Sequence, residues 1–417
     1  MKFKKTIAII VISILLLSIY SQAVIAAEII NGINNTGSNP LNSNGIHNIN
    51  DDTNSNLFNK SQNMIYVDNN TEENHYHDLR TAINKSKAGD IICIEPGFYK
   101  GSENSNITVD HELTIVGNNT NKIGIDANNT KDNRYTNNTY FSSNIVFDGE
   151  KINNFFTIEK NVNLTLLNLT FTNGASQSHG GAIINNGTLT IDHSSFLNNS
   201  VIKISDDNND WYDNPHGSTE DLKNISDSSK SFGGAIYSTN QLTIINSNFE
   251  NNSAGEYSKG GAIFNLGEKL DINNTLFKCN GAYDGGGAVF NKGGSLLVDH
   301  STFELNFAST DTSSSGGGAI YAEDTNININ NSIFGFNIAS RSYGGAINNK
   351  DSSLTSNNNY FIGNIADGGD GGAIYSLRNT ETFINGSLFL MNNASADGGA
   401  IYHKASKSYN IQNSALI

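Results

Sequence analysis

The sequence predicts an all-β fold, a right-handed parallel β-helix with about 27 residues in each coil. The first observation behind this prediction is the tripeptide Gly-Gly-Ala, whose consecutive copies begin about 27 positions apart, except for one gap of about twice that length. The second is a Phe-x-x-Asn marker, which follows a Gly-Gly pair by roughly 17 positions in seven copies. A fixed period of this length is typical of a solenoid with one supersecondary unit per repeat. The Gly-Gly-Ala copies begin at Gly180, Gly233, Gly260, Gly286, Gly317, Gly344, Gly371 and Gly398, and we call the gap between the first two the long interval.

A short stretch of alternating apolar residues lies between the two markers of a repeat. Residues 189–191, 242–244 and 327–329 show the period of two and the β-branched residues that are typical of strands. We therefore expect three short strands and three turns per coil, with successive coils pairing about 4.8 Å apart. In such a stack the glycines permit a bend, the phenylalanines fill the lumen and the asparagines form an amide ladder. The right hand follows from the rule for parallel crossovers.

Residues 1–63 are expected to lie outside the solenoid. Residues 1–27 predict a signal peptide, because Lys2, Lys4 and Lys5 precede an apolar run and small residues follow it. An uncleaved membrane anchor is the alternative, since residues 6–27 are just long enough to span a bilayer. Both interpretations place the rest of the chain outside the cytoplasm. Residues 28–63, rich in Asn, Ser, Gly and Thr, are interpreted as a disordered linker.

Residues 64–174 are expected to form an N-terminal cap and the first coils. Residues 78–87 predict a short capping helix, with Asp78 as N-cap and with Leu79, Ala82 and Ile83 on its apolar face. Strand-like runs occupy residues 64–67, 91–94, 107–109, 113–116, 145–147, 155–158 and 164–171, and residues 127–143 are interpreted as a polar insertion.

Residues 175–417 are expected to form the repeat solenoid, interrupted by an acidic insertion at residues 201–230. This insertion fills the long interval and lacks alternation, so we interpret it as an excursion rather than a degenerate coil. Loops on rigid scaffolds often carry function, which makes Trp211, Asp206, Asp207 and Asp210 candidates for recognition. Calcium binding is a second possibility, although no ligand spacing is recognisable. A solvated loop without a role is the third.

A column of aromatic residues is a further candidate for binding. The residue after Gly-Gly-Ala-Ile is usually aromatic, and Tyr237, Tyr321, Tyr375 and Tyr402 belong to this column. Side chains alternate along a strand, so these rings face opposite to the Ile that precedes them. Rings on the outside would form a stripe suited to stacking on sugars or on a partner, whereas rings on the inside would be core. The sequence leaves both orientations open.

Few charged groups are placed to act together. Asp370 and Asp397 each precede Gly-Gly in consecutive coils, so we expect them to stack about 5 Å apart, the separation of carboxylates in retaining glycosidases. Solvated turn residues or a weak cation site are the alternatives. His193 and His300 share a register but lie roughly 19 Å apart, too far for one metal ion, and we interpret them as turn residues. We assign no catalytic residue, metal site or cofactor.

The composition excludes several classes of protein. Asp and Glu number 40 against 25 Lys and Arg, a formal net charge of −15, which disfavours nucleic acid as a partner. Two cysteines cannot make a disulfide framework, and we expect Cys93 and Cys279 to be buried strand residues. Beyond residues 1–27 no segment is long and apolar enough to span a membrane.

The repeats, read as Gly-Gly-Ala-Ile followed by Phe-x-x-Asn, resemble those of the chlamydial polymorphic outer membrane proteins. The motifs Gly89-Asp90-Ile-Ile-Cys-Ile94, Pro96-Gly97-Phe-Tyr99 and Leu113-Thr-Ile-Val-Gly117 resemble the start of pectate-lyase-like β-helix domains. They are especially similar to adhesin-like surface proteins of methanogenic archaea. Together the resemblances cover residues 64–417. The sequence ends where the next Phe-x-x-Asn is due, so we expect either a truncated product or a partner that covers the open edge.

These resemblances imply a secreted or cell-surface protein that acts in adhesion or as a structural surface component. Its expected partners are surface glycans or the surface proteins of other cells, bound along the solenoid. The alternative function is that of a polysaccharide lyase or hydrolase with the pectate-lyase-like fold. A spacer without any ligand is a third hypothesis.

Overall fold

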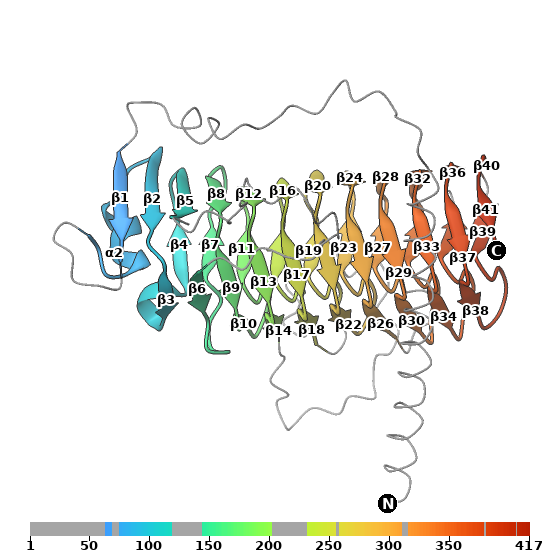
Figure 1. Ribbon diagram of the computed structural model, residues 1–417, viewed down its shortest axis with the longest axis horizontal. Helices are drawn as coiled ribbons and strands as arrows, with labels where there is room; N and C mark the ends of the chain where they lie inside the picture. The colour runs from blue at the N-terminus through green and yellow to red at the C-terminus, as the bar shows by residue number, and fades with distance from the viewer. Residues whose placement is uncertain are drawn as a thin grey trace, which may run out of the picture. The chain divides into compact units, whose positions relative to one another are not determined.

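The computed structural model describes residues 63–68, 75–118, 144–201, 232–255, 258–310, 316–378, 381–405 and 407–417. The expected signal peptide, the linker up to residue 62 and the polar insertion lie outside these ranges. So do residues 202–231, which hold Trp211, Asp206, Asp207 and Asp210. Residues 63–417 form one compact unit, and its strands stack along a single axis as parallel neighbours (Figure 1). The predicted parallel solenoid is therefore confirmed.

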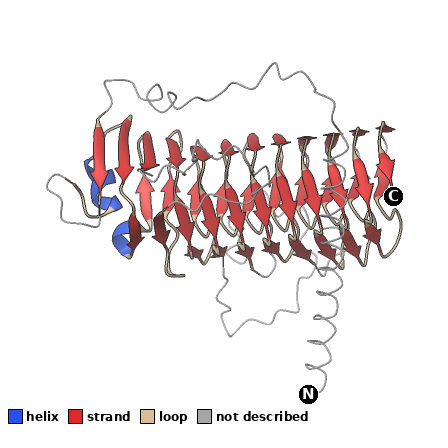
Figure 2. Cartoon of the chain, viewed as in Figure 1, coloured by secondary structure: helices blue, strands red, loops and turns tan. Residues whose placement is uncertain are grey.

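Four parallel sheets run along this solenoid, so a full coil contributes four strands rather than the expected three (Figure 2). The additional strand follows the Asn of each Phe-x-x-Asn marker and is only two or three residues long. A strand that short cannot show an alternating pattern, which is why the sequence did not reveal it. The alternating stretches expected at residues 189–191, 242–244 and 327–329 belong to the largest sheet. Its members are β1 (Met64–Val67), β2 (Asp90–Ile94), β5 (Leu113–Gly117), β8 (Asn163–Leu167), β12 (Thr188–Asp192), β16 (Leu242–Ile245), β20 (Lys269–Asn273), β24 (Ser295–Asp299), β28 (Asn326–Asn330), β32 (Ser353–Asn357), β36 (Glu381–Asn385) and β40 (Tyr409–Gln412).

The Phe marker and the residues after it build two further sheets. The strands that carry the Phe form an 11-stranded sheet: β3 (Gly97–Lys100), β6 (Ile145–Asp148), β9 (Thr170–Thr172), β13 (Ser195–Leu197), β17 (Asn248–Glu250), β21 (Leu276–Lys278), β25 (Thr302–Glu304), β29 (Ile333–Gly335), β33 (Tyr360–Ile362), β37 (Leu388–Leu390) and β41 (Ala415–Leu416). The short strands after the Asn form an 8-stranded sheet: β10 (Ala175–Ser176), β14 (Ser200–Val201), β18 (Ser253–Ala254), β22 (Gly281–Ala282), β26 (Phe307–Ser309), β30 (Ile338–Ser340), β34 (Ile365–Asp367) and β38 (Asn393–Ala394).

The eight strands that follow Gly-Gly-Ala join two earlier strands to form the fourth sheet, which has ten strands. They are β4 (Ile107–Val109), β7 (Phe156–Ile158), β11 (Ile183–Asn185), β15 (Ile236–Ser238), β19 (Ile263–Asn265), β23 (Val289–Lys292), β27 (Ile320–Glu323), β31 (Ile347–Lys350), β35 (Ile374–Arg378) and β39 (Ile401–Ala405). Strands β11 and β15 follow the two Gly-Gly-Ala copies that bound the long interval, and they pair directly, Ile183 with Ile236. No coil therefore stands between them in the ladder.

The Phe and Asn residues of the Phe-x-x-Asn marker form two buried columns along the stack, as predicted. The rings of Phe249, Phe277 and Phe303 stack at centroid distances of 5.0 and 4.7 Å, and all three are fully buried. One turn later the side-chain amide of Asn252 donates to Oδ1 of Asn280 at 2.9 Å, and Asn280 repeats the contact with Asn306 at 3.0 Å. Buried amides need such partners, and the stack supplies them coil by coil.

A short helix, α2 (Leu79–Lys85), packs at the N-terminal end of the solenoid core, as expected (Figure 1). Oδ1 of Asp78 accepts a hydrogen bond from the backbone N–H of Thr81 at 2.6 Å and so caps the helix. The backbone N–H of Leu79 donates to Oδ1 of Asn104 at 2.9 Å, next to the 3-10 turn η1 (Ser102–Asn104). Within the described ranges, every helix is too short to traverse a bilayer.

Candidate functional site

The aromatic column faces away from the lumen but is not exposed. Tyr237, Tyr321 and Tyr375 have relative exposures of 4, 2 and 6%, and the isoleucines before them point into the main core. Tyr237 and Tyr321 belong instead to a second apolar cluster with Phe232, Phe264 and Phe290. These rings therefore take the outward orientation, one of the two that the sequence left open, but they are covered rather than exposed as a stripe, and a binding role for them stays a prediction. They form a separate core on the outer face of the 10-stranded sheet.

The residues just before Gly-Gly cover this second core. The ring of His179 stacks on Tyr237 at 4.5 Å, Phe232 on Phe264 at 4.3 Å, and Tyr343 on Tyr375 at 4.5 Å. The sequence did carry a signal for this arrangement, because an aromatic or His residue directly precedes Gly-Gly at several positions. Tyr402 is only half-buried and stacks on Tyr375 at 5.4 Å. It is the one tyrosine of the four candidates with substantial accessible surface.

A buried ion pair continues the same outer face. Nζ of Lys350 lies 2.6 Å from Oε1 of Glu323, and Nζ of Lys292 lies 3.8 Å from Oε2. The Glu323 and Lys350 side chains are each only 4% exposed. Burial raises the pKa of Glu323, but the Lys350 hydrogen bond and the lysine charges outweigh it and hold the pKa below its usual value. Sequence reasoning missed this cluster, because its members come from three different coils.

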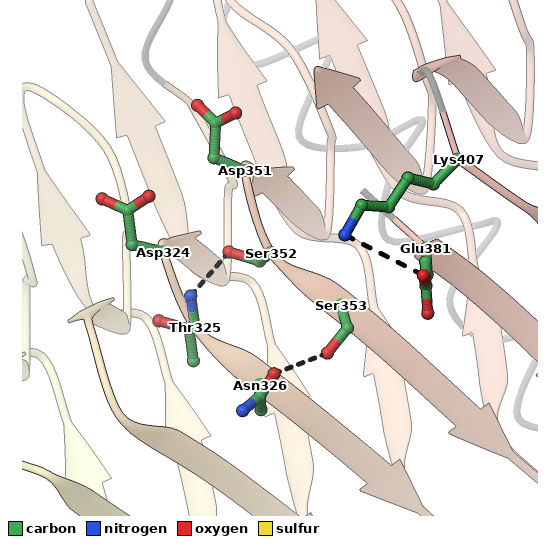
Figure 3. Close-up of a pocket in the computed structure, with 8 residues that line it drawn as sticks. All are labelled: Asp324, Thr325, Asn326, Asp351, Ser352, Ser353, Glu381 and Lys407. Carbon is green, nitrogen blue, oxygen red and sulfur yellow. Dashed lines mark hydrogen bonds and ion pairs between the residues drawn. The ribbon is translucent and has the colours of Figure 1, made fainter. Parts of the chain in front are cut away.

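An open groove lies beside this ion pair, at the turns between the 10-stranded and 12-stranded sheets. It has a volume of about 440 Å³ and spans neighbouring coils (Figure 3). Asp324 and Asp351 occupy matching turn positions with φ of 53° and 50°, and Figure 3 shows both carboxylates pointing away from the strands. The groove is lined by Asp324, Thr325, Asn326, Asp351, Ser352, Ser353, Glu381 and Lys407.

The groove combines charged groups of both signs with hydroxyl and amide groups. Nη1 of Arg378 lies 3.4 Å from Oδ2 of Asp351. Figure 3 shows the second ion pair, in which Nζ of Lys407 lies 3.9 Å from Oε1 of Glu381. Ser353 donates to Oδ1 of Asn326 at 2.8 Å. Such groups are suited to hydrogen bonding with a polar ligand that lies along the surface. Within the described ranges, no three His, Cys, Asp or Glu residues are grouped to hold a metal ion.

Asp370 and Asp397 do lie in neighbouring coils, but their contact is not between two carboxylates. Oδ1 of Asp370 accepts a hydrogen bond from the backbone N–H of Asp397 at 2.9 Å. Asp370 is half-buried, whereas Asp397 is exposed. The Asp370 carboxylate thus holds the next turn in place, and a binding role for the pair stays a prediction.

The two histidines and two cysteines considered in the sequence lie in turns or strands. His193 and His300 have φ of 46° and 47°, as expected for turns, and each Nδ1 contacts the preceding aspartate, at 2.7 and 3.0 Å. Cys93 is buried in β2, as predicted. The prediction for Cys279 is wrong. This residue is exposed in a turn with φ of 54°, the position that Asn takes in several other coils.

Comparison with known proteins supports the repeat assignment. Residues 246–266, 300–323 and 360–377 match the family model of the Chlamydia polymorphic membrane protein (Chlamydia_PMP) repeat. The repeats of this chain are similar to that family's repeats. A comparison with curated proteins finds no match.

Solved structures similar to the chain include that of a PL6 family alginate lyase, AlyGC. The sequence identity is 14% and the TM-score is 0.39. The similarity covers 85% of this chain and 40% of the lyase chain, so the present sequence spans well under half of that protein.

Proposed function

We propose that this chain is an adhesin-like protein of the cell surface or the secreted fraction, whose solenoid binds surface glycans or the surface proteins of other cells. The observation that carries the proposal is the match of three segments to a repeat of surface membrane proteins. The architecture supports it, because coils in register repeat polar side chains along one side, such as Asn326 beside Ser353 and Asn330 beside Asn357.

We assign the partner contact to the groove of Figure 3. It is open, it crosses several coils and it offers hydroxyl, amide and carboxylate groups rather than an apolar cavity. A polar chain such as a glycan can lie along such a surface and contact equivalent positions in neighbouring coils. Tyr402 remains a second candidate contact, since its ring is only partly covered.

The experiment measures binding of the full chain to glycan arrays and to whole cells. Asp351→Asn combined with Glu381→Gln removes two groove carboxylates, and we expect at least about a fivefold loss of binding. Glu268→Gln is the matched control, because Glu268 is exposed at the same kind of turn several coils earlier. Equal binding by the groove variant and the control would assign the contact to another face. A chain that binds no cell or glycan would overturn the adhesin proposal in favour of a spacer.

The competing enzymatic function is tested on pectate and related polyuronates, with and without calcium. We expect no cleavage by the purified chain. Cleavage that Asp370→Asn abolishes would overturn the adhesin proposal and assign a polysaccharide lyase or hydrolase. Labelling of intact cells with an antibody to the solenoid tests the surface location, which we expect to be accessible without permeabilisation.

A further inference from the structure

A serine, a histidine and an aspartate contact one another at the N-terminal end of the solenoid. Ser86 is the C-cap of α2, and Asp110 and His111 lie in the turn between β4 and β5. Nε2 of His111 lies 2.9 Å from Oγ of Ser86, and Nδ1 of the same ring lies 2.6 Å from Oδ1 of Asp110. Ser86 and His111 are 25 positions apart, so no local pattern in the sequence reveals this arrangement.

Each nitrogen of the His111 ring faces the partner that general base catalysis requires. The hydrogen bond with His111 holds the pKa of Asp110 below its usual value, so this carboxylate is ionised and accepts the proton on Nδ1. In the neutral ring Nε2 then carries a lone pair that faces the Ser86 hydroxyl. A nucleophile, a base and a group that orients the base thus lie within hydrogen-bond distance, in the order that serine hydrolases use.

The Ser86 hydroxyl also has a contact at the end of the helix. Its Oγ lies 2.7 Å from the backbone oxygen of Ile83. That oxygen accepts a hydrogen bond from the backbone N–H of Ser86 as well, at 3.2 Å. The hydroxyl proton can therefore turn to His111 while Ile83 keeps a donor. The backbone oxygens at this end of α2 also favour the positive charge that His111 acquires when it takes the proton.

The surroundings of Ser86 are open to a substrate. Ser86 is half-buried, and the His111 side chain is 22% exposed. Among the residues that the structure describes, no group accepts a hydrogen bond from the backbone N–H of Ala88, two positions after Ser86. This N–H is available to the negative oxygen that forms in acyl transfer, and the exposed Lys87 adds a positive charge beside it. Such a surface site suits an ester that projects from a larger molecule, for example an O-acetyl group of a polysaccharide.

We propose that Ser86 is the nucleophile of a carboxylic ester hydrolase site, with His111 as general base and Asp110 as positioning residue. Oγ of Ser86 bonds to the ester carbonyl carbon, and its proton passes to Nε2 of His111. The bond to the leaving alcohol then breaks, and Nε2 returns the proton to the alkoxide. Water that gives its proton to the same nitrogen attacks the acyl-serine and releases the carboxylic acid. The inference goes beyond the proposed function, because it depends neither on adhesion nor on cleavage of polyuronates.

A fluorophosphonate probe tests the nucleophile in the full chain, because attack by Oγ on phosphorus expels fluoride and leaves a stable label. We expect the label on Ser86, located by peptide mass spectrometry, and hydrolysis of p-nitrophenyl acetate above the buffer rate. Ser86→Ala should abolish both, and His111→Gln should slow both at least about 100-fold. Asp110→Asn should slow both at least about tenfold, and Asp110→Glu should restore part of the rate, which a loss of local structure would not predict.

His300→Asn is the matched control for the His111 variant. Nδ1 of His300 contacts the preceding Asp299 at 3.0 Å, and Asn331 holds the matching turn position in the next coil. The control should react like the wild type, and circular dichroism reports whether each variant is folded. A wild type in which Ser86 stays unlabelled, or in which the label lies on another residue, would overturn the proposal whatever the stability of the variants. A folded His111→Gln variant that is labelled at the wild-type rate would overturn it as well.

Discussion

At the scale of single residues, the lumen is held together by amides that each make several bonds. Nδ2 of Asn337 donates to the backbone oxygen of Phe303 and to Oδ1 of Asn364, both at 2.9 Å. Its own Oδ1 accepts from the backbone N–H of Asn306 at 3.0 Å and from the side chain of Asn306 at 2.9 Å. Asparagine suits this column because one short side chain both donates and accepts while it closes a turn.

Asn337→Ala should lower the free energy of unfolding by about 3 kcal/mol, because it leaves the buried backbone oxygen of Phe303 and the backbone N–H of Asn306 without this partner. Asn328→Ala is the control, since Asn328 is exposed on the outer face of β28, and its effect should stay within about 0.5 kcal/mol. Urea denaturation followed by circular dichroism measures both. Similar effects at the two sites would show that the ladder adds little stability.

Glu323 and Lys350 stabilise the fold only as a pair. Lys350→Met should cost about 3 kcal/mol, because it removes the hydrogen-bonded partner and leaves the buried Glu323 charge with the more distant Lys292 and Lys259. Replacing both residues by Leu should restore most of that loss, since Leu377 already follows Lys350 in the same column. Thermal unfolding of the single and the double variant distinguishes the two outcomes. A single variant as stable as the wild type would contradict the role assigned to the pair.

The stability of the fold should also depend on pH, through the ionisation of Glu323. Its pKa is lowered in the folded chain, so its contribution is fully present above the unfolded pKa and is lost as the pH falls through the folded value. We expect the difference in midpoint between the wild type and the double Leu variant to shrink steadily below the ordinary glutamate range. A difference that is constant down to the folded pKa and below it would show that the pair is not ionised.

At the scale of elements, the bend before each strand of the 10-stranded sheet depends on its first glycine. Gly344 has φ of 68°, and a Cβ there would lie 2.2 Å from the backbone oxygen of Ile347. Gly335 in β29 has nothing within 4 Å of an added Cβ and no unusual φ. The backbone conformation therefore requires glycine at position 344, whereas position 335 in the neighbouring coil could hold another residue.

Gly344→Ala should lower the free energy of unfolding by at least about 2 kcal/mol, because the new methyl group meets backbone in a left-handed conformation. Gly335→Ala should be neutral or slightly stabilising. Denaturant midpoints of the two variants give the comparison. Equal midpoints would show that the bend can relax without cost.

The sequence predicted the elements whose residues repeat, and it missed those defined by contact between coils. Strand β4 and the N-cap at Asp78 were located correctly, because alternation and capping are local patterns. The single run expected at residues 164–171 is divided into β8 and β9, since Asn168 turns the chain with φ of 56°. The cover over Tyr237 was missed, because period two fixes which way a ring points but not what packs against it.

At the scale of the whole molecule, all the described strands of the solenoid stack along one axis. Neighbouring strands pair in register across the long interval as they do elsewhere, for example Leu189 with Leu242. Other coils make the same connection with far fewer residues, such as 255–259 between β18 and Gly260. We therefore expect residues 202–231 to be dispensable for the stacking of the coils that flank them.

Replacement of residues 202–231 by a short Gly-Ser linker should leave the unfolding temperature within about 2 °C of the wild type. Differential scanning calorimetry and far-UV circular dichroism measure the result. The same variant, used in the cell-binding assay, tests the candidate recognition residues Trp211, Asp206, Asp207 and Asp210. A large drop in unfolding temperature would mean that the segment belongs to the stack.

The amide ladder also gives the solenoid a polarity. From Asn199 to Asn364 each Nδ2 donates to Oδ1 of the ladder asparagine in the following coil, so the Oδ1 atoms from Asn252 to Asn392 accept from the preceding coil. An inverted coil would bring two donors or two acceptors face to face in a dry interior. Grafts that exchange coils between solenoids of this type will therefore join only head to tail, with the same sense of donation on both sides of the seam.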